Sequence, residues 1–113
     1  MDIKYYEDVG ARPVDIEGAK EVKVRWLISQ KEGAPNFAMR LFEISPGGFT
    51  PLHTHDWEHE VFILEGKGVA NDGEKETKLK SGTVVYVAPK EKHQFKNTGS
   101  ETLKFLCLIP IKK

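Results

Sequence analysis

Short β-prone segments, separated by glycine and proline, recur along this chain of 113 residues. Their spacing of roughly eight to twelve residues is typical of an all-β sandwich or barrel built from antiparallel strands. No long amphipathic helix competes with this pattern. The best helical candidate, residues 14–23, is poor, and residues 1–20 indicate extended arms and loops. We therefore predict one all-β domain over residues 1–113, with strands in residues 21–29, 36–45, 60–66, 76–80, 83–89, 93–97 and 102–109.

Three of these segments carry more specific expectations. Residues 21–29 alternate, with valine, valine, tryptophan and isoleucine at positions 22, 24, 26 and 28, which predicts a half-buried strand. Residues 83–89 are mostly apolar and indicate a buried strand, whereas residues 76–80 are polar and indicate an edge strand. Between the third and fourth segments, Asp72 and Gly73 predict a hairpin turn, because this pair readily takes positive φ.

Charge and composition exclude several classes of function. Lysine plus arginine equals aspartate plus glutamate at 17 each, so the formal net charge is zero. Nucleic acids and anionic membranes both select basic surfaces, so we predict neither as a partner. The first residues lack the apolar region of a secretory signal, and the longest apolar run, residues 105–111, is too short to span a bilayer. The lone Cys107 allows no internal disulfide. These features predict a soluble cytoplasmic protein that acts on a small molecule.

All four histidines of the chain lie in two short segments. His53, His55 and His59 fall within seven residues, and His93 comes from a distant strand segment. Residues two apart on a strand point to the same side, so His53 and His55 can converge on one ion. Neutral imidazole binds manganese, iron, nickel, copper and zinc. The pattern therefore predicts one transition-metal site.

A helical alternative exists for part of this segment. His55 and His59 are four residues apart, as in the zinc-protease pattern, with Asp56 in place of the usual glutamate. Pro51 before the segment and the β-prone residues 61–63 after it leave no room for a helix of ten residues. We therefore favour a strand-based site.

Two motifs resemble those of the cupins. Gly47, His53, His55 and Gly66 have the spacing of the first cupin motif (residues 47–66). The second motif (residues 82–97) is matched by Gly82, Pro89, His93 and Asn97, although the spacings around the proline each differ by one residue. The chain is most similar to very small single-domain cupins that have a four-histidine manganese site. The resemblance implies a jelly-roll β-barrel and, usually, a homodimer.

Two residues, His59 and Glu60, are candidates for the position that a glutamate ligand usually occupies in cupins. His59 satisfies the spacing from His55 and the spacing to Gly66, whereas Glu60 satisfies only the first. Neighbouring residues of a strand point to opposite faces, so only one of them can face the metal. We choose His59, because the register of the strand depends on the glycine, and keep Glu60 as the alternative ligand.

Four histidine ligands have chemical consequences. Because they leave the divalent charge uncompensated, we expect the metal to stay reduced. Manganese is the first choice, with iron, nickel or zinc as alternatives. An octahedral ion would keep two positions open for an oxygen ligand. Our first expectation is an oxygenase-like oxidoreductase in which the metal itself carries the chemistry. The alternatives are a Lewis-acid isomerase or lyase and a non-catalytic ligand-binding protein.

Five further residues are candidates for the substrate pocket, each with an ordinary structural alternative. Phe105 and Cys107 share a strand face and can line the metal pocket, although a free cysteine often behaves as a small core residue. Arg40 can orient an anionic ligand or lie on the solvent face. Thr50 can shape the pocket, and Trp57 can cover its entrance or pack as an ordinary indole.

Overall fold

The computed structural model describes residues 1–112 and contains almost only strands. Two single-turn 3-10 helices, η1 (Tyr6–Asp8) and η2 (Gln30–Glu32), are the helical elements of this range. No helix in residues 1–112 has the length and apolar character needed to cross a membrane. The strands are β1 (Arg12–Pro13), β2 (Lys20–Ile28), β3 (Phe37–Phe49), β4 (His59–Glu65), β5 (Gly68–Asn71), β6 (Glu76–Leu79), β7 (Val84–Val87), β8 (Gln94–Asn97) and β9 (Leu103–Pro110).

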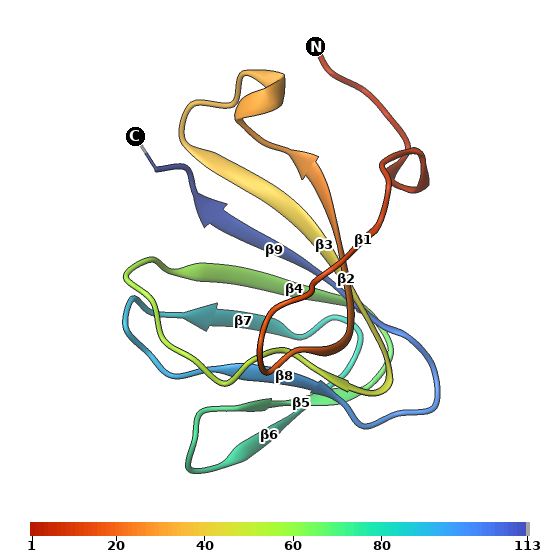
Figure 1. Cartoon of the computed structure of the whole chain (residues 1–113), viewed down its shortest axis with the longest axis vertical. Helices are drawn as coiled ribbons and strands as arrows, with labels where there is room; N and C mark the ends of the chain where they lie inside the picture. The colour runs from red at the N-terminus through yellow and green to blue at the C-terminus, as the bar shows by residue number, and fades with distance from the viewer. Residues whose placement is uncertain (113) are drawn as a thin grey trace.

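The strands form one antiparallel sheet that curls on itself (Figure 1). Its main path runs β6-β5-β8-β3-β9-β4-β7, and β2 pairs with the other edge of β3. The long strand β3 explains the curl: its first eight residues pair with β9, whereas its last residue, Phe49, pairs with Lys96 of β8. The rings of Phe95 on β8 and Phe105 on β9 lie 5.0 Å apart across the interior. The all-β prediction is confirmed.

The core lies inside this curled sheet. Inward-facing residues alternate along β4 and β9, so that Val61, Ile63, Leu103, Phe105 and Cys107 are all at most 2% exposed. Such alternation is the expected pattern for strands with one covered face. The remaining buried members of the core cluster come from the other strands: Val22, Ile44, Leu79, Val87 and Phe95.

Two strand predictions are wrong in part. In β2 the predicted burial of alternate residues ends after Val24, because Trp26 is 45% exposed. A register shift lies between Trp26 and Ile28, so Leu27 is buried and Ile28 is exposed. The strand expected to be buried, β7, is an edge strand that pairs only with β4, so Val84 and Tyr86 are 73% and 62% exposed.

The helical alternatives are also resolved. Residues 14–23 form no α-helix, and β2 begins at Lys20. Asp56 and Trp57 form a bend before β4 begins at His59, so the segment from His55 to His59 has no helical turn. The zinc-protease reading is therefore wrong.

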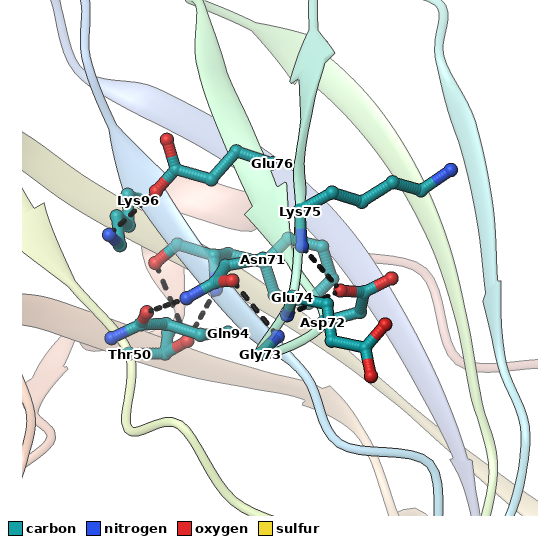
Figure 2. A network of polar contacts seen from close by, with 10 residues as sticks. Thr50, Asn71, Asp72, Gly73, Glu74, Lys75, Glu76, Gln94 and Lys96 are labelled. Atoms are coloured by element: carbon teal, nitrogen blue, oxygen red, sulfur yellow. Dashed lines mark hydrogen bonds and ion pairs between the residues drawn. The ribbon is translucent and has the colours of Figure 1, made fainter.

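The predicted hairpin joins β5 to the edge strand β6 (Figure 2). Gly73 has φ +95°, and the Asp72 carboxylate accepts hydrogen bonds from the backbone N–H groups of Glu74 and Lys75, both at 2.9 Å. These bonds lower the pKa of Asp72. Asn71 donates to the Gln94 side chain at 2.9 Å, which ties the hairpin to β8. The turn is thus held by its own side chains and by the adjacent strand.

Asn97, at the end of the second motif, is a buried structural residue. Its Nδ2 donates to the carbonyl oxygens of Ile44 and Glu101, both at 2.8 Å, and its Oδ1 accepts from the Gly99 N–H. Three hydrogen bonds satisfy the buried amide and join β3, β8 and the turn before β9. This arrangement fixes the strands that carry the candidate site residues.

Candidate metal centre

The four histidines come from three places in the fold. His53 and His55 lie in the connection between β3 and β4, His59 begins β4, and His93 directly precedes β8. The backbones of His53 and His93 form an isolated antiparallel bridge, with N–H to carbonyl distances of 3.2 and 3.1 Å in the two directions. The His55 carbonyl accepts from the Lys90 N–H at 2.7 Å. Backbone hydrogen bonds therefore bring the two motifs together.

The imidazole rings gather around one point. His53, His55 and His93 each offer a ring nitrogen, and these nitrogens lie within 4.8 Å of one another, which suits a metal ion. The His59 ring lies beside them, with its centroid 4.5 Å from that of His55 and 5.0 Å from that of His93. The Nε2 atoms of His55 and His59 are 2.6 Å apart. All four sequence-predicted histidines are thus neighbours.

Hydrogen bonds fix how three of these rings face the cluster. The Nδ1 of His55 lies 2.8 Å from the Trp57 carbonyl, and the Nδ1 of His93 lies 2.9 Å from the Glu91 carbonyl. A carbonyl only accepts, so Nδ1 carries the proton in both residues and Nε2 keeps its lone pair. The Nδ1 of His59 instead lies 2.9 Å from Sγ of Cys107. Orientation of this kind is what metal-ligating histidines require.

The surroundings favour the neutral form of three of these rings. Burial, followed by the positive charge of Arg40, lowers the pKa of His59 to about 3. Burial, followed by the neighbouring imidazoles, also lowers the pKa values of His53 and His55. Neutral imidazole is the form that binds metal ions, so these three rings are ready to bind at neutral pH.

Glu60 lies on the other side of β4. It is exposed and borders a separate hollow with Phe37 and Leu108 on the outer surface, whereas His59 is only 8% exposed. The alternation of β4 accounts for this difference, as expected from the position of Gly66. The fold thus brings His59, and not Glu60, to the other histidines.

A cavity of about 380 Å³ opens beside the histidine cluster. This volume lies within the range of small-molecule sites. All five predicted pocket residues line it: Arg40, Thr50, Trp57, Phe105 and Cys107. The Thr50 hydroxyl accepts from the Phe95 N–H at 2.8 Å, and the Trp57 ring stacks on His55 with centroids 4.2 Å apart. The remaining wall is apolar and is formed by Val14, Ile16, Val24, Trp26, Phe42, Pro51, Phe95 and Ile109.

Arg40 is the one cationic side chain among the residues that line this cavity. Its guanidinium carbon lies 4.8 Å from the Phe42 ring centroid and 5.3 Å from that of Trp26, and its Nη2 donates to Sγ of Cys107 at 3.1 Å. Within residues 1–112, its buried Nε has no hydrogen-bond acceptor. Burial lowers the pKa of Arg40 and raises the pKa of the Cys107 thiol. The positive charge of Arg40 partly offsets this increase in the pKa of Cys107.

Sequence reasoning missed most of the aromatic wall. Phe42 has the same parity as Arg40 on β3 and could have been found from that signal. Trp26 pairs with Arg40 in the register of β2 and β3, which only the structure reveals. Val14 and Ile16 lie in the segment that is both the weak helical candidate and part of the predicted extended arm, and no sequence pattern marks them as cavity residues.

Comparison with known proteins agrees with this architecture. Residues 40–109 match the family described as "Cupin domain". The chain belongs to the cupin family. The matched residues include all four histidines and all five predicted pocket residues, with Arg40 at the first matched position. The predicted cupin barrel is confirmed.

The names of individual relatives of this cupin refer to different functions. The oxalate-binding protein of Thermotoga maritima is 37% identical over 96% of this chain and 93% of its own length. The structure of the polyketide cyclase RemF from Streptomyces resistomycificus has a TM-score of 0.93 and 35% identity, over 99% of this chain and 80% of that one. The glucose-6-phosphate isomerase of Pyrococcus abyssi is 37% identical over 72% of this chain and 49% of its own length. Membership of the family therefore leaves the substrate open.

Proposed function

We propose that this cupin is a metal-dependent enzyme in which His53, His55, His59 and His93 hold one divalent transition metal, manganese first, with iron, nickel and zinc as alternatives. The observation that carries the proposal is the convergence of four imidazoles beside a cavity. The donor set fits such an ion, because the anchored Nδ1 atoms of His55 and His93 leave the Nε2 lone pairs free. The bound metal would act as a Lewis acid that polarises a substrate oxygen.

The charge around the cluster favours Lewis-acid chemistry over a redox cycle. Four neutral imidazoles do not compensate the charge of a divalent ion, and the Arg40 guanidinium adds a further positive charge 3.3 Å from Nδ1 of His59. A more highly charged metal state is therefore disfavoured. Two relatives are named for a cyclisation and an isomerisation, which supports the same class of reaction for this chain. We thus place an isomerase-, lyase- or cyclase-type reaction first.

An oxygenase-like oxidoreductase is the second candidate. His53 is an exposed residue that lines the cavity. A small oxidant such as dioxygen can therefore approach the cluster from solvent. Non-catalytic binding is the third candidate, supported by the relative named as an oxalate-binding protein. Metal substitution separates these three functions.

Metal substitution is expected to leave turnover intact. Protein purified without an affinity tag should contain one divalent transition metal per chain by elemental analysis. After removal of that metal, zinc should restore turnover on a panel of polyketone, hydroxycarboxylic and sugar substrates to within about tenfold of manganese, because a Lewis acid needs no change of oxidation state. Turnover with manganese or iron alone, coupled to oxygen consumption, would favour the oxidoreductase. Ligand retention without turnover under every condition would favour the binding protein.

The cavity supports a flat, mostly apolar substrate with an anionic or oxygen-rich end. Trp26, Phe42 and Phe105 provide aromatic walls, and the apolar wall gains free energy by excluding water from such a molecule. The oxygen-rich end would meet Arg40 and the histidine cluster together. Arg40 is a charged donor on the cavity wall. A hydrogen bond from its guanidinium to a ligand oxygen would contribute to affinity, because hydrogen bonds to charged groups are stronger than neutral ones.

Salicylate is a suitable probe of this substrate class, because it combines a flat ring with adjacent hydroxyl and carboxylate groups. Replacing Arg40 by glutamine (Arg40→Gln) is expected to weaken salicylate binding to the zinc-loaded protein by about tenfold or more, since hydrogen bonds to charged groups contribute about 1.5–3 kcal/mol. Quenching of tryptophan fluorescence measures the binding. The matched control is Arg25→Gln, which removes an arginine that contacts the Val9 carbonyl and Glu43 and is not a cavity residue. Equal losses in both variants would contradict this role of Arg40.

A further inference from the structure

The group that faces Nδ1 differs among His55, His59 and His93. His55 and His93 direct Nδ1 at backbone carbonyls, whereas Nδ1 of His59 faces Sγ of Cys107 at 2.9 Å. A carbonyl can only accept a hydrogen bond, but a thiol can either donate or accept one. The protonation pattern of His55 and His93 is therefore fixed by the backbone, and that of His59 is not.

Without a metal, the neighbouring ring determines where the proton of His59 lies. Nε2 of His55 carries a lone pair, because the Nδ1 of that ring donates to Trp57. Nε2 of His59 lies only 2.6 Å from this lone pair, so a neutral His59 must place its proton on Nε2 and donate to His55. Its Nδ1 is then an acceptor, and the thiol S–H of Cys107, at 2.9 Å, and Nη2 of Arg40, at 3.3 Å, are both within reach to donate to it.

With a metal in the cluster, the same ring needs the opposite tautomer. His59 would then offer the lone pair of Nε2 to the metal, so a proton would occupy Nδ1 instead. Nδ1–H now donates to Sγ of Cys107, and Nη2 of Arg40, 3.1 Å from the sulfur, donates to it as well. In this state the sulfur is an acceptor for both groups.

We propose that Cys107 is a positioning residue that supports both tautomers of His59 by reversing the direction of its hydrogen bond when the metal binds. This inference rests on the proposed metal site. No covalent bond to sulfur forms or breaks. One proton leaves Nε2 of His59 and another occupies Nδ1, so the charge of the ring is unchanged. The thiol hydrogen turns away from the ring at the same time. A serine hydroxyl can make the same exchange, whereas a valine of similar size cannot, so substitutions separate hydrogen bonding from packing.

Nitrogen-15 NMR of the full chain, in the chelator-treated and zinc-loaded states, tests the inference. In the wild type, His59 is expected to carry its proton on Nε2 in the first state and on Nδ1 in the second. Cys107→Ser should keep this exchange and a zinc dissociation constant within about threefold of the wild type. Cys107→Val should weaken zinc binding by about 10–100-fold, as is usual for loss of a group that orients a ligand. Leu103→Val, a buried change on the same strand outside the cavity, is the control and should bind zinc normally.

Each outcome has a distinct meaning. Wild-type zinc affinity in Cys107→Val, or a His59 proton that stays on one nitrogen in both states, would overturn the role of Cys107 while leaving the metal site intact. A wild-type protein that takes up none of the divalent transition metals would contradict the proposed function itself, and this inference with it. Unchanged Nδ1 protonation of His55 and His93 in Cys107→Val verifies that the variant keeps the local fold.

Discussion

Replacing His59 by alanine is expected to lower zinc and manganese affinity by more than about a hundredfold, because loss of an outer orienting group alone costs about 10–100-fold. The reason is geometric: Nε2 of His59 lies 2.6 Å from Nε2 of His55, inside the cluster. Competition with a chromophoric chelator measures the affinity. The substitution also removes the partner of the Cys107 thiol, so the thermal midpoint of the metal-free variant should be recorded beside the affinity.

Glu60→Ala is the matched control for this experiment. Glu60 is the next residue of the same strand, but it is exposed on the outer face of β4, so its removal should change metal affinity less than threefold. The reverse pattern, with metal lost in Glu60→Ala and kept in His59→Ala, would show that the carboxylate is the ligand. That result would require a one-residue change of register in β4.

The metal-free protein is expected to lose stability steeply as the pH falls below 6.5. His59 has a pKa of about 3 in the folded chain, lowered mainly by burial, against an ordinary value of 6.5. Between these two values the unfolded chain binds a proton at this residue and the folded chain does not, so acid favours unfolding. One such group lowers the free energy of unfolding by about 1.4 kcal/mol per pH unit, or about 2–3 kcal/mol between pH 6.5 and 4.5.

Urea unfolding of chelator-treated protein at a series of pH values measures this loss. His53 and His55, whose pKa values are also lowered, add to the loss in the same direction. His59→Gln should flatten the dependence on pH, whatever its effect on stability at pH 7.5. A wild-type free energy of unfolding that stays constant from pH 6.5 to 4.5 would show that His59 is not held neutral by the fold.

Much of the fold follows from local sequence signals. Glycine and proline divide the chain into segments that alternate or are apolar, and β4 and β9 then obey the period of a strand with one buried face. The errors occur where the partner strand matters. The register shift near Ile28 depends on how β2 meets β3, and the exposure of Val84 and Tyr86 depends on β7 being last in the sheet. Neither fact is present in the segment itself.

The candidate site was predictable to a similar extent. The spacing of the histidines and the position of Gly66 predict that His59, and not Glu60, faces the other histidines, and the structure places His59 beside them. The direct contact of Cys107 with His59 and Arg40 was not predictable, because it joins residues 48 and 67 positions apart. Parity suggested only that the thiol shared a face with Phe105. The aromatic wall depends in the same way on pairing between distant strands.

The pairing of β9 with both β3 and β4 has a consequence for how the protein is made. This strand is synthesised after the other eight, and it carries Cys107 and Phe105. Until β9 pairs, the two parts of the sheet that it joins, one ending at β3 and the other at β4, are not held together by strand pairing. Long-range pairing of this kind folds slowly. If the proposed site binds metal, a cation met before β9 pairs would find the histidines without Phe105 and Cys107 behind them, and its affinity there would differ from that of the finished barrel.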